Sequence, residues 1–126
     1  KIKGEKKYHV LHADTFVQQL GNGTEESKAR MQSSLNYAWH FALGIFEESE
    51  FENEIISKKI FAREIELKKR WLEKITPIIE ASGLKIPVTN ESKIVYGGRK
   101  GFHSEHLKPL LDEMCEVVRT DINAEW

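Results

Sequence analysis

The chain has 126 residues, with 19 Lys and Arg against 20 Asp and Glu, and a net charge of −1 at pH 7. This length suits one domain with its own apolar core, and because there is no basic surplus we expect no nucleic-acid partner. The apolar stretches are too short to cross a bilayer and the lone Cys115 cannot form an internal disulfide, so we expect no membrane partner and a cytoplasmic location.

The first predicted helix spans about residues 5–20, where apolar side chains recur at helical spacing. The sequence starts without methionine and already inside this pattern, so we expect it to be a fragment of a longer chain. Gly21 and Gly23 in LGNGTEES allow the left-handed geometry of a helix end. Thr24 is a good N-cap residue, so a second helix should begin there.

The second predicted helix carries a broad apolar face. At 100° per residue this face covers an arc of about 160°. Its members are Met31, Leu35, Ala38, Trp39, Phe41, Ala42, Ile45 and Phe46. A helix this broadly apolar is usually packed on two sides, so we expect it to contact more than its neighbours in this chain.

An acidic connection over 47–54 and a short helical turn over about 55–61 come next. A third helix is predicted from about Arg63 to Ser82, and Gly83 should end it.

Residues 85–101 are predicted to be loop, followed by a fourth helix with Ser104 as its N-cap. The apolar side chains of that helix are Leu107, Leu110, Leu111, Met114, Val117 and Val118. The fold class is therefore all-α, a helical bundle.

Glu5, His9 and His12 share one face of the first predicted helix, at positions i, i+4 and i+7. Carboxylate and imidazole groups on one helix are common metal ligands. Di-iron bundle proteins, however, place histidine three residues after glutamate, and at that position after Glu5 this chain has Tyr8. Two lysines beside Tyr8 also disfavour a dication. We therefore expect no metal, and these three residues are the only candidates. The alternative is that Tyr8, His9 and His12 are half-buried and hydrogen-bonded between helices.

The segment GGRKGFHSEHL, residues 97–107, places glycines and bases before a helix start, where unpaired backbone N–H groups favour an anion. A phosphate or a partner's carboxylate fits such a segment, although serine and glutamate in the first turn can also satisfy it internally. A polar contact with a partner or between helices is the favoured interpretation. The candidate residues are Arg99, Lys100, His103, Ser104, Glu105 and His106.

Nucleophilic chemistry has one candidate, Cys115, within the fourth predicted helix. No basic residue stands next to it in the sequence to activate the thiol, so we interpret it as packing. The sequence shows no complete active site, and we assign no catalytic residue.

Two long runs carry a resemblance to a known family. They are QQLGNGTEESKARMQ at 18–32 and GGRKGFHSEHLKPLLDEM at 97–114. Together with the closing Trp126 they resemble the C-type subunits of the phenylacetyl-CoA epoxidase complex. The resemblance covers the whole chain and corresponds to the C-terminal half of those subunits.

The resemblance implies that residues 1–126 are a single helical domain, the C-terminal part of a ferritin-like fold. It implies a non-catalytic structural subunit without a cofactor, which supports the related catalytic di-iron subunit in a hetero-oligomer. That complex uses oxygen and reducing equivalents from a reductase subunit to epoxidise the ring of phenylacetyl-CoA.

Two alternatives stay open. The first is a metal-binding ferritin-like enzyme in its own right that uses Glu5, His9 and His12. The second places a coenzyme A phosphate at residues 97–106.

Overall fold

The computed structural model describes residues 2–123 of the chain. The chain divides into two compact units, Lys1–Tyr96 and Gly97–Trp126. Residues 2–123 form helices and turns and no strand, which confirms the predicted all-α class. The single domain over 1–126 stays a prediction, and Trp126 lies outside the described residues.

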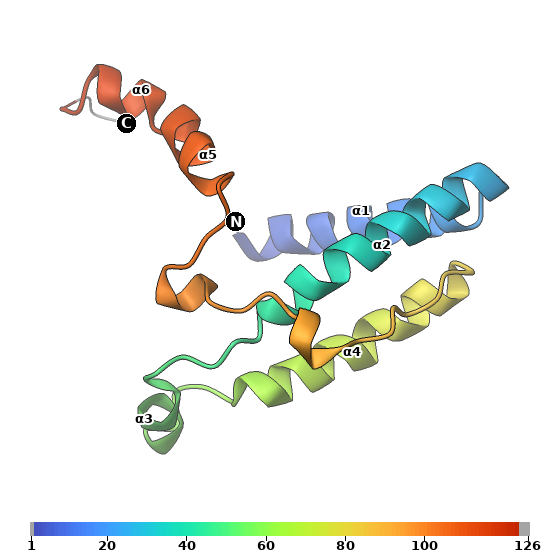
Figure 1. Cartoon of the computed structure of the whole chain (residues 1–126), viewed down its shortest axis with the longest axis horizontal. Coiled ribbons are helices and arrows are strands. Elements are labelled where there is room, and N and C mark those ends of the chain that lie inside the picture. Colours follow the sequence, from blue (N-terminus) through green and yellow to red (C-terminus); the bar gives the residue numbers. More distant parts are fainter. Residues whose placement is uncertain (1, 124–126) are drawn as a thin grey trace. The chain divides into compact units, whose positions relative to one another are not determined.

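Three long helices make up most of the first unit: α1 (Ile2–Gly21), α2 (Glu25–Gly44) and α4 (Glu64–Ala81). Figure 1 shows them running side by side, with the short α3 (Glu52–Ser57) in the connection between α2 and α4. The turn predicted over 55–61 is thus a helix that starts and ends a few residues earlier. Thr24 is the N-cap of α2, as predicted, and its side chain accepts a hydrogen bond from the Ser27 N–H at 3.1 Å.

Both ends of α4 are capped. Gly83 has a positive φ of 66°, and the Leu84 N–H donates to the Ile79 carbonyl at 3.2 Å, so the predicted glycine end is confirmed. At the other end the buried Glu52 of α3 accepts a hydrogen bond from the Glu64 N–H at 3.1 Å. A carboxylate there satisfies an unpaired N–H and faces the positive end of the helix dipole.

A segment over residues 85–95, which we call the strap, follows α2 and closes the core. The Gln32 side chain exchanges two hydrogen bonds with the Lys85 backbone, at 2.8 and 2.9 Å. Further along, the Val95 N–H donates to the His40 carbonyl at 3.3 Å. The core lies beneath and consists of Trp39, Leu43, Ile79, Leu84 and Ile94. The predicted loop is therefore an ordered part of the packing and contains a 3₁₀ turn at Glu91–Lys93 (η1).

The second unit consists of a 3₁₀ turn at Gly98–Lys100 (η2), then α5 (Leu107–Met114) and α6 (Glu116–Thr120). Gly97 and Gly101 have positive φ angles of 109° and 83°, and the Phe102 N–H donates to the Gly97 carbonyl at 2.9 Å. These glycines therefore form a closed turn before α5. Neither α5 nor α6 has a buried residue.

The predicted N-cap at Ser104 is wrong, because α5 begins at Leu107 with His106 at the N-cap. Pro109 explains the later start. A helix that began after Ser104 would need an N–H from residue 109 for the Glu105 carbonyl, and proline has none. With His106 as the cap, Pro109 falls in the first turn, where N–H groups have no intrahelical partner. Ser104 contributes its backbone carbonyl, which accepts from the Leu107 N–H at 3.1 Å.

The predicted fourth helix is also not continuous. Cys115 separates α5 from α6, with φ −91° and ψ −1°, which is outside ideal helical geometry. The β-branched pair Val117 and Val118 follows after Glu116, and such residues favour helix less than Leu or Met do. Cys115, which we interpreted as packing within a helix, is half-buried at this junction.

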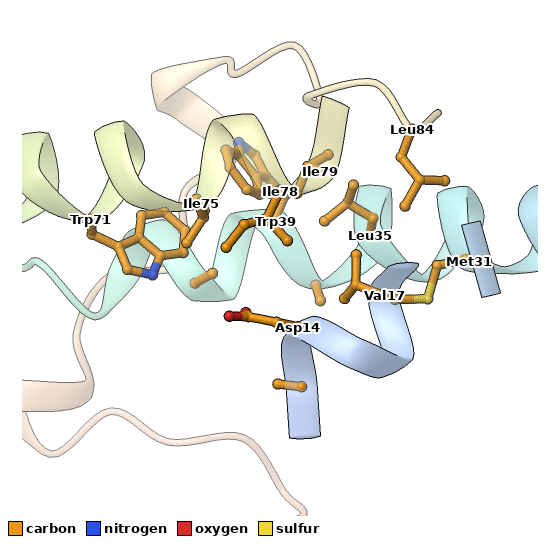
Figure 2. Close-up of a pocket in the computed structure, with 13 residues that line it drawn as sticks. Asp14, Val17, Met31, Leu35, Trp39, Trp71, Ile75, Ile78, Ile79 and Leu84 are labelled. Atoms are coloured by element: carbon orange, nitrogen blue, oxygen red, sulfur yellow. The ribbon is translucent and has the colours of Figure 1, made fainter. Parts of the chain in front are cut away.

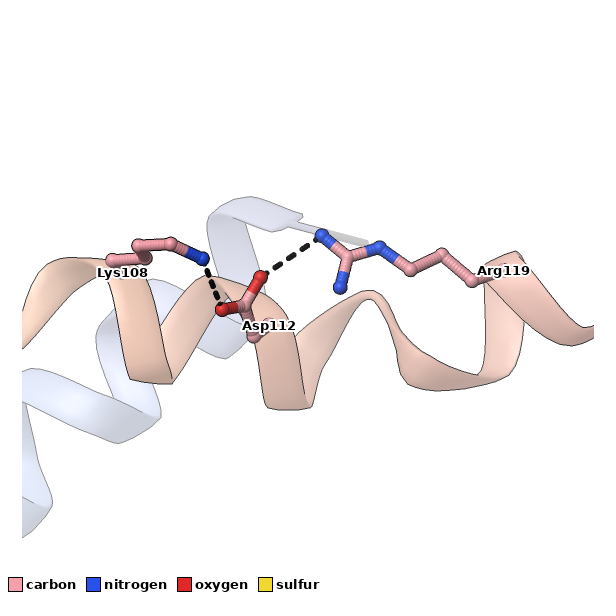
Figure 3. A network of polar contacts seen from close by, with 3 residues as sticks. All are labelled: Lys108, Asp112 and Arg119. Carbon is pink, nitrogen blue, oxygen red and sulfur yellow. Dashed lines mark hydrogen bonds and ion pairs between the residues drawn. The ribbon is translucent and has the colours of Figure 1, made fainter.

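Asp112 links the two short helices through charge (Figure 3). Its carboxylate accepts from Lys108 at 2.6 Å and from Arg119 at 3.0 Å. Hydrogen bonds from Lys108 and then Arg119 hold the pKa of Asp112 below its ordinary value of 3.8. The contribution of this network to stability is therefore complete above pH 3.8 and is lost as the pH falls through the lower folded pKa.

We expect an NMR titration of the Asp112 carboxyl carbon to show a midpoint below 3.8 in the unsubstituted chain. Replacing Lys108 by glutamine should move the midpoint upward more than Arg119→Gln, because the Lys108 hydrogen bond is the larger cause of the shift. The helix signals of residues 107–120 should weaken over the same pH range. Midpoints that both substitutions leave unchanged would contradict this assignment.

Candidate functional site

An exposed apolar row lies along the C-terminal half of α2 and its C-cap residue, formed by Tyr37, Phe41 and Ile45, which we call the outer stripe. Their side chains are 74%, 48% and 66% exposed, and successive members are four residues apart, so they share one face of the helix. The rings of Tyr37 and Phe41 are 5.5 Å apart. Three large apolar side chains in a continuous row on a solvent-facing helix are typical of a surface that another protein covers.

The outer stripe is one edge of the broad apolar face predicted for this helix. Trp39 from the opposite edge is buried in the core, and Met31 and Leu35 pack against it. Phe41 and Ile45 from the predicted set remain exposed. Tyr37 was missing from the prediction, although its spacing of four from Phe41 could have revealed it, and so was the buried Leu43.

The three metal-ligand candidates lie in the exposed half of α1. Glu5, His9 and His12 are all exposed, as is Tyr8, so the alternative of half-buried residues bonded between helices is wrong. His12 instead belongs to an aromatic row, with ring distances of 6.0 Å to Tyr8 and 4.5 Å to Phe16.

Within residues 2–123 no three His, Cys, Asp or Glu side chains are grouped as metal ligands would be. Whether the protein binds metal is not tested by this geometry, so the expectation of no metal stays a prediction. None of the helices in that part of the chain is long and apolar enough to cross a membrane.

The candidate anion or partner segment lies in the second unit. Arg99 and Lys100 are in η2, and His103, Ser104 and Glu105 are in the connection that leads to α5. All of these side chains are exposed, as is His106 at the N-cap of α5. The segment leads into α5, which has eight residues. This placement does not test a role in contacting a phosphate or a partner, so that role stays a prediction.

A cavity of about 240 Å³ lies between α1, α2 and α4 (Figure 2). Val17, Leu35, Trp39, Trp71 and Ile75 are among the side chains that line it. The indole rings of Trp39 and Trp71 are 5.4 Å apart. Asp14 stands at the edge of the cavity and is the one charged residue among its described lining residues.

Beside this apolar cavity, α1 and α4 form a second hollow of about 410 Å³, which we call the lysine cleft. Lys3, Lys6 and Lys7 come from one face of α1 and Lys74 comes from α4. Asp14 lines both hollows, so they adjoin. This arrangement was not predicted, because it depends on how α1 packs against α4.

Comparison with known proteins identifies the family of this chain. The family model described as "Phenylacetic acid catabolic protein" matches residues 1–126. A relative from Escherichia coli (strain K12), the C-type subunit of 1,2-phenylacetyl-CoA epoxidase, is 30% identical over 122 residues. The match covers 97% of this chain and 48% of the relative, so the chain spans about half the length of that protein. The chain therefore belongs to the phenylacetic acid catabolic protein family, whose fold is ferritin-like.

Proposed function

We propose that this chain acts in phenylacetate catabolism as part of a non-catalytic, C-type subunit of a phenylacetyl-CoA epoxidase complex. In this proposal the subunit uses no cofactor and supports the catalytic di-iron subunit. The family match over residues 1–126 and the name of the Escherichia coli relative support the assignment to such a complex.

The outer stripe is the observation that supports a structural, non-catalytic role for this subunit. Tyr37, Phe41 and Ile45 remain exposed while the other edge of α2 is fixed in the core of its own unit. Burying large apolar side chains against a partner contributes about 25 cal/mol per Å² of apolar surface removed from water. Aromatic residues at the centre of an interface often dominate its binding energy. We therefore place the contact with the catalytic subunit on this face of α2.

Replacing Phe41 by glutamate should weaken complex formation at least about tenfold, because a charge would be buried in the apolar contact. The measurement is the amount of catalytic subunit that co-purifies with tagged protein after co-expression. Ala29→Glu is the matched control, since residue 29 is exposed on the same helix but lies off the outer stripe. Unchanged co-purification of Phe41→Glu, with helical circular dichroism intact, would contradict the proposal.

The rival function, a metal enzyme that uses Glu5, His9 and His12, has its own test. Iron analysis of the intact protein after dialysis distinguishes the two functions, because stoichiometric iron that Glu5→Gln and His9→Gln remove would support the enzyme.

For residues 97–106, Arg99→Ala with Lys100→Ala should lower the affinity of the complex for acyl-CoA if a phosphate binds there.

A further inference from the structure

The apolar cavity and the lysine cleft together have the properties of one amphiphilic site. The cavity is partly open to solvent and is lined by side chains of α1, α2 and α4 together with Leu84, and it is apolar except at Asp14, among the residues that the structure describes. An apolar cavity of this kind does not hold water well, and it accepts an apolar group of matching size. Ligand sites in proteins commonly combine such a lining with a few charged groups at one end.

The lysine cleft supplies the charge at that end. Four ammonium groups against one carboxylate leave a formal excess of three positive charges around the opening. Within residues 2–123 none of these lysines forms an ion pair with a carboxylate of the chain. Like charges on neighbouring turns repel one another, so an anion bound among them relieves that repulsion as well as gaining its own attraction.

Asp14 lines both the apolar cavity and the lysine cleft, so the two hollows meet at its side chain. A bound molecule that fills both must therefore pass this carboxylate, with its apolar part on the side of Trp39 and Trp71 and its charged part on the side of Lys74. A cationic head group would meet the four lysines, and a neutral head group would gain nothing from them. Charge complementarity selects an anionic head.

We propose that the apolar cavity and the lysine cleft bind a free single-chain amphiphile with an anionic head, such as a medium-chain carboxylate. Its hydrocarbon chain lies against Trp39 and Trp71, and its head group lies among Lys3, Lys6, Lys7 and Lys74. This site is separate from the outer stripe, so its test and the co-purification test can fail independently.

Isothermal titration calorimetry with sodium dodecanoate at monomeric concentrations tests the proposal, and tryptophan fluorescence gives a second signal because Trp39 and Trp71 line the cavity. We expect saturable binding of one dodecanoate per chain. Dodecanol should bind at least several-fold more weakly, and dodecyltrimethylammonium should not saturate the site. Equal affinity for dodecanol and dodecanoate would overturn the role of the lysines.

Charge substitutions should change the affinity in opposite directions. Lys74→Gln should weaken dodecanoate binding about two- to fivefold, the usual range for one exposed charge pair, and Asp14→Asn should strengthen it by a similar factor. Lys69→Gln removes the same charge from the exposed surface of α4 outside the cleft and should have no effect. The opposite signs for Lys74→Gln and Asp14→Asn would overturn the proposed orientation.

Filling the cavity tests where the chain lies. Ala38→Leu and Ala13→Leu each add an apolar side chain to the lining and should each abolish saturable binding, while Ala29→Leu on α2 outside the cavity should leave it intact. Unchanged binding by both filled variants, with normal circular dichroism, would place the ligand elsewhere.

Vesicles of dioleoylphosphatidylglycerol should not retain the chain in flotation. Retention that Ala38→Leu does not alter would assign the lysines to a lipid surface and overturn the proposal.

Discussion

Replacing Trp39 by alanine is expected to lower the free energy of unfolding by about 3–5 kcal/mol, the usual cost of removing a large buried aromatic side chain. Trp39 is only 3% exposed and belongs to the first unit's core. Its indole N–H donates to the Thr89 hydroxyl at 3.1 Å, and its ring contacts that of Trp71. Alanine therefore removes apolar contacts with α4 and one of the bonds that hold the strap to α2.

Urea unfolding followed by circular dichroism at 222 nm measures this change without depending on tryptophan emission. Tyr37→Ala is the matched control, because Tyr37 is an aromatic residue two positions away on the same helix and is mostly exposed. Its substitution should change stability by no more than about 0.5–1 kcal/mol. Thr89→Val should show a small separate loss from the hydrogen bond, about 1 kcal/mol. Equal losses for Trp39→Ala and Tyr37→Ala would mean that the core is not where the structure places it.

Replacing Gly44 by alanine should cost about 3 kcal/mol, because the strap crosses α2 at this residue. A Cβ there would lie well inside the contact distance of the Val95 carbonyl oxygen, which is backbone and can move only with the strap. Moving the strap would also strain the hydrogen bond from the Val95 N–H to His40.

Gly4→Ala is the matched control and should have the opposite sign. Gly4 lies within α1, and an added Cβ would meet nothing within 4 Å. Alanine there should raise stability by about 0.5–1 kcal/mol, because glycine loses more conformational entropy when it becomes helical. Thermal unfolding of both variants gives the comparison. A midpoint that rises for Gly44→Ala would show that the strap does not press against α2.

The sequence predicted the elements whose signals are local. Thr24 and Gly83 act through their own turns, so the start of α2 and the end of α4 were both correct. Ser104 was a wrong N-cap because the decisive residue, Pro109, lies five positions away and excludes the earlier start by lacking an N–H.

Features formed between distant segments could not be predicted. The strap was expected to be a plain loop because its hydrogen bonds join residues separated by about fifty positions, such as Gln32 and Lys85. Glu52 belongs to the acidic connection predicted over 47–54, yet it is buried and caps the start of α4. For the candidate site, the breadth of the apolar face on α2 indicated an exposed edge, but the lysine cleft needs Lys74 from α4 beside α1.

The strap also determines when this core can form during synthesis. Leu84 and Ile94 supply two of the core side chains, and both follow α4 in the chain. A growing polypeptide that has emerged from the ribosome only as far as α4 can pair its helices but leaves Trp39 without its cover. Packing the strap onto α2 closes the loop between Gln32 and Lys85, and this closure costs chain entropy. Chaperone engagement with the nascent chain should therefore end once residue 95 has left the exit tunnel.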